Sequence, residues 1–241
     1  MANRNTAQKL SKRQNGQSQY ITTSAPFQNL KDLPVPLTES QCVLHKHEIL
    51  ICGGEFKRYC YSYHILKNEY KFICEYPNDV ILDGHCVVKL MDNNNKDNNE
   101  ITLLSFGGYQ YRHTLVMKYA SVWSNDNEMN KSKKLEKLSN YNEWVPLTND
   151  NNNPFHIGRN GDYYNGVRTL IGGSNNHLLF ITYRPHNISV FDLNTFQFIK
   201  HDTLPTRNGI SFHCFVSKSK MVKMNEAKNK KIMKCCYFVV D

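Results

Sequence analysis

The stretch Glu48-Ile-Leu-Ile-Cys-Gly-Gly-Glu55 is an apolar run that ends in two successive glycines, and it returns as Ile101-Thr-Leu-Leu-Ser-Phe-Gly-Gly108. A short apolar run bounded by turn residues is typical of a buried β-strand. Two glycines at its end allow backbone angles and close approaches that a Cβ forbids. The recurrence therefore predicts a repeated strand that ends in a glycine pair: Gly53 and Gly54 in the first copy, Gly107 and Gly108 in the second.

A second apolar-aromatic run follows each glycine pair, and a further aromatic residue follows that run. The later segment Asn187-Ile-Ser-Val-Phe-Asp192 repeats this order, although Ile181 and Thr182 stand where its glycine pair is expected and Gly172 and Gly173 lie earlier, in a turn. The repeat thus predicts three sets of equivalent positions. These are Tyr63, Tyr119 and Phe191 in the run, and Phe72, Trp144 and Phe198 beyond it.

Proline provides a second anchor for the repeat. Eight residues beyond Pro34, Pro77 and Pro205 stand Cys42, His85 and His213, and each of them opens an apolar run. The third repeat lacks this proline, but Arg159-Asn-Gly161 reappears as Arg207-Asn-Gly209. We therefore expect His85 and His213 to mark the start of equivalent first strands.

The recurring order resembles the kelch repeat, in which a first strand opens near a His, a second ends in Gly-Gly, a third carries Tyr and a fourth carries Trp or another aromatic. The resemblance extends from about Phe27 to the C-terminus. Kelch units of about fifty residues each form one four-stranded blade of a β-propeller. The resemblance implies an all-β fold, a kelch-type β-propeller.

The repeat also predicts the domain organisation. Residues 1–26 are polar and aperiodic, and we expect a disordered tail. Residues 27–241 are expected to form a partial kelch propeller with blades at about 42–77, 80–147 and 159–204 and an incomplete one at 208–241. Since a closed propeller has about four to eight blades, about three and a half blades make an incomplete ring. Either the chain is a fragment, which we prefer, or it self-associates through open propeller edges.

Charge and hydropathy restrict the partners. The net charge of +9 would suit nucleic acid, but the basic stretch from Lys218 to Lys234 lacks the interleaved aromatics or recognition helix of specific nucleic-acid modules. Nucleic-acid binding is therefore disfavoured. No run approaches the roughly 20 apolar residues of a membrane helix, and residues 1–25 lack the apolar segment of a secretory signal. We expect a cytoplasmic location and no membrane partner.

The Cys and His residues do not predict a metal site. Most of the eight cysteines lie in apolar strand runs, where a thiol packs as a small hydrophobic group, and none forms a C-x-x-C pair. His45 and His47 would share one face of a strand, but no third ligand accompanies them, and we expect both to be solvated near a turn. Neither a metal nor another cofactor is predicted.

Motifs for catalysis are missing, since the chain contains no G-x-S-x-G, P-loop or H-E-x-x-H sequence. We therefore expect a non-enzymatic protein-protein interaction platform, or scaffold, that binds partners through propeller loops. The loops after the second strands bring Arg together with Tyr or His, and Arg and Tyr dominate protein interfaces. The candidates are Arg58 and Tyr59, then Tyr111, Arg112 and His113, then Arg184 and His186.

A basic-aromatic ring of this kind would suit an acidic peptide, although each residue alone is equally consistent with an ordinary solvated turn. The ring predicts that charge reversal at Arg58 and Arg112 together abolishes partner capture and leaves the melting temperature unchanged. The alternative function is an enzyme-type propeller, a kelch-like oxidase or sugar epimerase. A bound metal or converging carboxylates at the centre of the ring would distinguish it.

Overall fold

A computed structural model of the chain describes residues 30–91, 100–108, 112–123, 141–149, 151–218 and 234–238. The chain divides into two units, Met1–Lys31 and Asp32–Asp241, and Leu30 and Lys31 are the described part of the first. The predicted polar tail, residues 1–26, lies outside the described residues. All the strands belong to the second unit.

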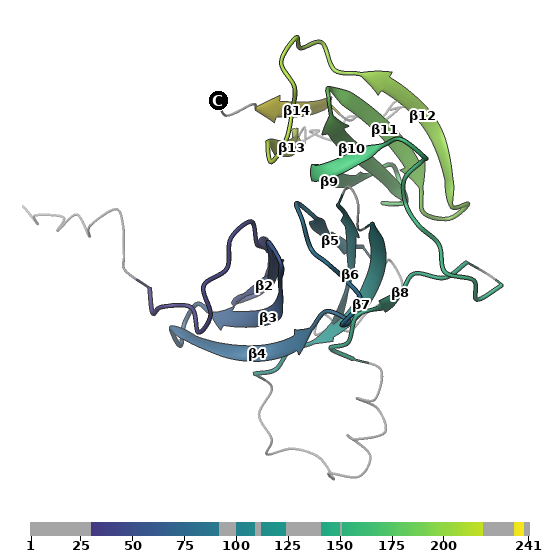
Figure 1. Ribbon diagram of the computed structural model, residues 1–241. Coiled ribbons are helices and arrows are strands. Elements are labelled where there is room, and N and C mark those ends of the chain that lie inside the picture. The colour runs from purple at the N-terminus through teal and green to yellow at the C-terminus, as the bar shows by residue number, and fades with distance from the viewer. Residues whose placement is uncertain are drawn as a thin grey trace, which may run out of the picture. The chain divides into compact units, whose positions relative to one another are not determined.

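The strands form four separate sheets, and within each sheet every strand pairs antiparallel with the next along the chain (Figure 1). The described residues contain no helix, membrane-spanning or otherwise. The first sheet contains β1 (Gln41–His45), β2 (Glu48–Gly54), β3 (Lys57–His64) and β4 (Glu69–Glu75). The second contains β5 (Cys86–Leu90), β6 (Glu100–Gly107), β7 (His113–Ala120) and β8 (Val145–Pro146). The third contains β9 (Tyr163–Gly172), β10 (Leu178–Arg184), β11 (Asn187–Asp192) and β12 (Gln197–Thr203). The fourth pairs β13 (Cys214–Lys218) with β14 (Lys234–Phe238). The all-β prediction is confirmed.

The first strands of the four sheets lie next to one another. β1 contacts β5, β5 contacts β9, and β9 contacts β13. Sheets that meet along their first strands are arranged as the blades of a propeller. The fold is therefore propeller-like, and three four-stranded sheets followed by a pair of strands are consistent with an open ring.

Backbone hydrogen bonds join the second, third and fourth sheets near the starts of their first strands. Gly166 N donates to Gly84 O at 2.8 Å, and Phe212 N donates to Gly166 O at 2.9 Å. Gly84 and Gly166 have positive φ, and a Cβ on Gly166 would lie 2.2 Å from Ser211 Oγ. Glycine is needed at Gly166 because any side chain would push the third and fourth sheets apart.

The histidines His85 and His213 occupy equivalent positions, as the sequence predicts. Each follows a residue of positive φ and lies just before a first strand, and each bonds to the preceding sheet. His85 Nε2 is 3.0 Å from Cys52 O, and His213 Nε2 is 2.6 Å from Thr182 Oγ1. The prediction that Cys42 occupies the third equivalent position is wrong.

Ser40 takes the equivalent place in the first sheet. It follows Glu39, whose φ is positive, and it precedes Gln41, which pairs with Cys52 as Cys86 pairs with Phe106. The connection from the proline to the first strand is two residues shorter before β1 than before β5, which the proline spacing alone does not reveal. Cys42 therefore lies within β1 and is exposed.

The third sheet corrects the alignment of the glycine pair. Thr182 pairs with Arg168 on the first strand, two residues after Gly166, as Phe106 pairs with Cys86, two residues after Gly84. Thr182 is thus equivalent to Phe106, so Tyr183 and Arg184 stand in the glycine positions, and Ile181 and Thr182 do not. The cause is a tighter hairpin: Thr182 pairs with Ile188, whereas Phe106 pairs with Thr114.

Register also corrects the position of the third-strand tyrosine in the second sheet. Tyr63 pairs with Ile49, Phe191 with Leu179, and Met117 with Leu103, so Met117 is their equivalent and Tyr119 lies two residues further on. Tyr119 is fully buried, and its hydroxyl donates to Glu48 Oε2 in the first sheet. Ser62 Oγ and Ser121 Oγ donate to the same carboxylate, at 2.8 and 2.5 Å, so its burial is compensated by hydrogen bonds.

The aromatics of the outer strands are not equivalent either. Trp144 is 2% exposed, stacks on Tyr76 at 4.7 Å between ring centroids and packs between the first and second sheets, whereas Phe72 is 52% exposed. Phe198 is partly buried against Phe191, in the cluster that joins the second and third sheets. The predicted substitution of Trp by Phe72 is wrong, because Phe72 lies outside the core.

Two expectations for Cys and His residues are also resolved. The six cysteines whose side chains are described are free thiols, four of them in or beside the core and two, Cys42 and Cys214, exposed. His45 was expected to be solvated, but it is 3% exposed and lies edge-on to the ring of Tyr119. Among the described residues no group of three or more Cys, His, Asp or Glu side chains is arranged to hold a metal ion.

Candidate partner-binding site

The predicted binding residues lie at the turns between second and third strands, as expected, but several are on the strands themselves. Arg58 and Tyr59 belong to β3, because the turn consists of Glu55 and Phe56. Arg112 immediately precedes β7, and His113 begins it. Arg184 ends β10, and His186 lies in the turn that follows. Tyr111 lies outside the described residues.

Arg58 is bound to its own sheet. Its guanidinium lies 3.3 Å from a carboxylate oxygen of Glu75 on β4, and it donates to Tyr76 O at 3.3 Å and to Asn78 Oδ1. The arginine fastens the chain segment that leaves β4. These three partners hold the guanidinium against its own sheet, and 31% of the side chain is exposed.

Arg112 connects the second sheet to the segment before the third. Its guanidinium donates to Arg159 O at 2.6 Å and to Asp162 O. Both acceptors are backbone carbonyls, so a side chain without a donor at position 112 would leave both of them without this partner. Reversal of charge at Arg58 and Arg112 would remove these bonds, so the structure leads us to expect a lower melting temperature rather than an unchanged one.

His113 is part of the core rather than of a loop surface. It is 5% exposed, and its Nε2 lies 2.9 Å from Ser105 Oγ, which also accepts a hydrogen bond of 3.0 Å from the Tyr76 hydroxyl. Burial, and to a smaller extent the nearby His85, lower the pKa of His113 to about 3. The histidine is therefore neutral at pH 7 and is not a recognition residue.

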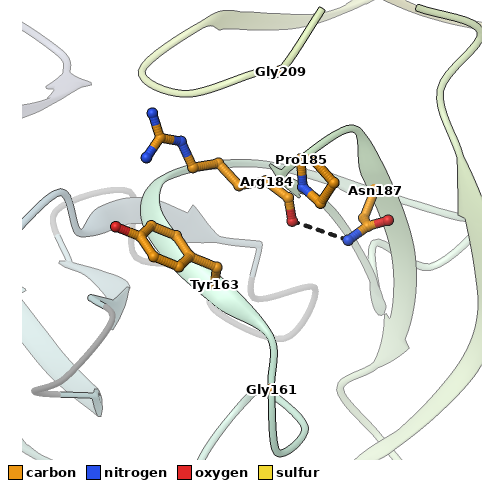
Figure 2. A pocket seen from close by; sticks show the side chains of 6 residues that line it. All are labelled: Gly161, Tyr163, Arg184, Pro185, Asn187 and Gly209. Carbon is orange, nitrogen blue, oxygen red and sulfur yellow. Dashed lines mark hydrogen bonds between the residues drawn. The ribbon is translucent and has the colours of Figure 1, made fainter. Parts of the chain in front are cut away.

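Arg184 differs from the other two arginines. Its side chain is exposed, and its guanidinium carbon lies 5.4 Å from the centre of the Tyr163 ring (Figure 2). Within the described part of the chain it makes no ion pair. The nearest acidic group in the preceding loop, Asp162, is occupied instead by Arg159, at 3.1 Å.

A shallow hollow of about 500 Å³ surrounds this arginine. Figure 2 shows Arg184 and Tyr163 on one side of it and Asn187 on the other, where Asn187 Nδ2 donates to Arg184 O at 2.9 Å. A Cβ on Gly161 would meet nothing within 4 Å, so the backbone there is open to a ligand. The hollow is lined by Gly161, Tyr163, Arg184, Pro185, Asn187 and Gly209.

The hollow brings together one predicted residue and several that the sequence analysis did not select. His186 is partly buried in the adjacent turn, and its carbonyl accepts a hydrogen bond of 2.7 Å from Leu204 N. Gly161 and Gly209 end the two Arg-Asn-Gly segments, so their recurrence was a usable signal for the lining. Tyr163 and Asn187 had no comparable signal.

Carboxylates gather at another place, near the turns that precede the first strands. Burial raises the pKa of Glu39, and the neighbouring carboxylates of Glu55 and Asp83 raise it further, while Arg168 opposes them. Asn165 Nδ2 donates to Asp83 Oδ1. These three carboxylates are the feature by which an enzyme-type propeller would be distinguished.

Comparison with known proteins gives a similarity at the level of structure alone. No protein-family model matches the chain. No curated protein matches its sequence. A solved structure described as "Structure of YjhT" aligns with 78% of the chain at 12% sequence identity and a TM-score of 0.47. The chain spans 58% of the length of that structure.

Proposed function

We propose that this chain is a cytoplasmic, kelch-type protein-interaction platform without catalytic activity, and that it binds an acidic segment of a partner protein in the hollow beside Arg184. The observation that carries the proposal is an exposed guanidinium held over an aromatic ring at the rim of an open hollow. Arg and Tyr supply charge, bidentate hydrogen bonding and rigid amphipathic area, which makes them frequent energetic centres of interfaces.

Charge supports an acidic partner. The chain carries a net charge of +9, and the carboxylate nearest in sequence to the hollow's Tyr163, that of Asp162, is paired with Arg159. A carboxylate that enters the hollow would therefore meet the unpaired positive charge of Arg184. Because the site is open to water, this attraction would be screened by salt, and binding should weaken at high ionic strength.

The test begins with a displayed library of random dodecapeptides, selected on the immobilised chain. The enriched peptide is synthesised with a fluorescein label, next to a version in which Asn and Gln replace each Asp and Glu. We expect enrichment of acidic residues and loss of binding by the neutral version. Arg184→Glu should weaken binding by about tenfold or more, as at other interface centres.

Lys118→Glu is the matched control, because it makes the same change of charge at an exposed side chain on β7 of the second sheet. It should leave the affinity for the acidic peptide nearly unchanged. Equal losses in the two variants would reduce the effect to overall charge and contradict the proposed site. Selection of peptides without acidic residues would contradict the proposed partner.

The enzyme alternative is favoured by one observation, the mutual influence of Glu39, Glu55 and Asp83. Paired carboxylates can divide the roles of acid and base in sugar chemistry. Incubation of the protein with a panel of hexoses and N-acetylhexosamines, followed by NMR, tests for oxidised or epimerised products. Turnover that disappears in Asp83→Asn would favour the enzyme, and absence of turnover across the panel would favour the platform.

A further inference from the structure

Three cysteines form a row across the first sheet, outside the proposed binding site. Cys52 on β2 pairs directly with Cys60 on β3, and Cys60 pairs directly with Cys74 on β4. Directly opposite residues of antiparallel strands project from the same face with Cβ atoms about 4.5–5.5 Å apart, close to the separation in a disulfide, about 3.5–4.5 Å. Little backbone movement is needed to join neighbours in this row.

Two thiols of the row have polar contacts outside it. Trp144 Nε1 donates to Cys60 Sγ at 3.4 Å, and the Cys60 thiol donates to Arg58 O at 3.9 Å. Cys74 Sγ donates to the thioether sulfur of Met117 at 3.7 Å. The pairing of β2 with β3 and of β3 with β4 places the three cysteines at neighbouring positions in the reduced protein.

Exposure distinguishes the members of the row. Cys52 and Cys60 are fully buried, whereas Cys74 is partly exposed. A small oxidant in water therefore reaches Cys74 first. The middle residue, Cys60, touches both neighbours and is the thiol that can close a bond with an oxidised Cys74.

We propose that Cys60 and Cys74 are a reversible modification site, at which hydrogen peroxide converts the two adjacent thiols into a cross-strand disulfide. The pairing of β3 with β4 places the two residues, and the exposure of Cys74 admits the oxidant. Since β4 is the outer strand of the first sheet, the bond would fix that strand covalently to its neighbour.

The reaction is balanced with peroxide as the sole oxidant. The sulfur of Cys74 attacks one peroxide oxygen, the O–O bond breaks, and the released hydroxide takes the thiol proton to form water, leaving a sulfenic acid. The sulfur of Cys60 then attacks the sulfenic sulfur, the S–O bond breaks, and the Cys60 proton leaves with the hydroxide as a second water. The two sulfurs lose two electrons, and the peroxide gains them.

The surroundings of Cys60 suit it to the second step. Burial raises the pKa of the Cys60 thiol, but the hydrogen bonds that it accepts from Cys52, Cys74 and Trp144 lower it well below its ordinary value. The thiolate is the nucleophile in disulfide formation, so a sulfur with three donors is the better resolving group. The hydrogen bond to Cys60 and burial raise the pKa of both Cys52 and Cys74, so exposure to the oxidant, and not acidity, distinguishes Cys74 from Cys52.

The native chain itself provides the test. The folded protein is treated with hydrogen peroxide, alkylated in denaturant and digested with trypsin, which separates the cysteines into the peptides 47–57, 59–67 and 72–89. We expect a peptide 59–67 linked to 72–89 through Cys74, as fragment ions that distinguish Cys74 from Cys86 will show. Dithiothreitol should release it. Cys86, buried beside Thr169 Oγ1 at 3.3 Å, is the internal control and should be alkylated.

Two cysteine variants test which of the three cysteines form the disulfide. Cys52→Ser should still form the link, and Cys74→Ser should leave Cys60 alkylated after the same treatment. A link between Cys52 and Cys60 in the native protein, or a Cys60 that stays reduced while Cys214 at the surface is oxidised, would overturn the proposal. The digest of the native protein does not depend on the folding of any variant. It therefore still tests the proposal if Cys74→Ser is unstable.

Discussion

Arg112 and Arg184 stand at the same end of the second and third sheets, each beside the turn between a second and a third strand. Their side chains differ in the groups that they contact. Arg112 donates to two backbone carbonyls of the segment before β9 and so joins two sheets. Arg184 lies exposed over the ring of Tyr163 at the edge of a hollow. One repeated residue type therefore bonds to the backbone of a neighbouring segment in one sheet and stays exposed in the next.

The difference arises from the neighbours rather than from the arginines. Opposite Arg112 the chain presents two carbonyl oxygens that need donors, those of Arg159 and Asp162. Around Arg184 the lining contains two glycines and a proline, which offer few side-chain acceptors. A repeat preserves the backbone position from which a side chain projects, whereas the neighbouring loops determine which groups that side chain contacts.

The largest expected effect concerns His113, which follows Arg112 and is buried. Burial lowers the pKa of His113 to about 3 and that of His85 to about 4, below the value of about 6.5 in the unfolded chain. The unfolded chain then binds protons first, so stability is complete above pH 6.5 and falls as the pH drops below it. Urea denaturation should show a loss of about 2 kcal/mol per histidine between pH 7 and pH 5.

Burial also lowers the pKa of His213 to about 4, so His113→Asn should remove about a third of the loss that the three histidines cause, whatever its stability at pH 7. His186→Asn, in the turn after Arg184, is the control and should retain the whole of it. If His113→Asn and the unchanged protein lost stability equally on acidification, the assignment of His113 to the core would be contradicted.

The next effect is on stability at pH 7. Arg112→Ala removes two charge-assisted hydrogen bonds and leaves two carbonyls without their donor, and we expect the free energy of unfolding to fall by about 2 kcal/mol. Thermal and urea denaturation measure it. Lys118→Ala, which removes an exposed charge from the same sheet, should stay within about 0.5 kcal/mol of the unchanged protein. A similar stability for both variants would contradict the claim that Arg112, unlike Arg184, supports the structure.

A smaller effect is expected on partner binding. Tyr163→Ala removes the ring under the guanidinium of Arg184, and the affinity for the selected acidic peptide should fall about three- to tenfold, as for a cation–π contact of about 1 kcal/mol. Tyr163→Phe keeps the ring and should bind nearly as well as the unchanged protein. Equal losses in both variants would show that the hydroxyl, not the ring, is used.

The smallest expected effect is the change in stability when Arg184 is replaced. Arg184→Ala loses a contact with one exposed ring, and its free energy of unfolding should change by about 0.5 kcal/mol at most. The melting temperature, compared with that of Arg112→Ala, measures this. A loss as large as that of Arg112→Ala would mean that Arg184 supports the structure too.

Sequence alone was sufficient for the strands. The apolar runs that end at Gly54 and Gly108 predicted β2 and β6, and the recurrence of the pattern predicted the four-stranded sheets, because alternation and turn residues are local properties. It misplaced the glycine positions of the third sheet, since the hairpin between β10 and β11 is shorter than its equivalents. Hairpin length is set by turn geometry, which residue spacing does not reveal.

The candidate site was less predictable because its contacts are distant in sequence. Arg112 bonds to residues 47 and 50 positions away, and nothing in the turn itself indicates those partners. The hollow beside Arg184 depends on Gly209, which a separate loop brings to it. The repeated Arg-Asn-Gly segments were visible in the sequence, but the proximity of their glycines to Arg184 follows only from the fold.

The most direct test of the account is an NMR titration of the isotopically labelled chain with the selected acidic peptide. We predict shifts of the amide signals of Gly161, Arg184, Asn187 and Gly209, which line the hollow, and their disappearance in Arg184→Glu. The amide signals of residues 39–84, which include Arg58, should not shift. Shifts confined to those regions, with the signals around Arg184 unchanged, would contradict the central claim that this hollow binds the partner.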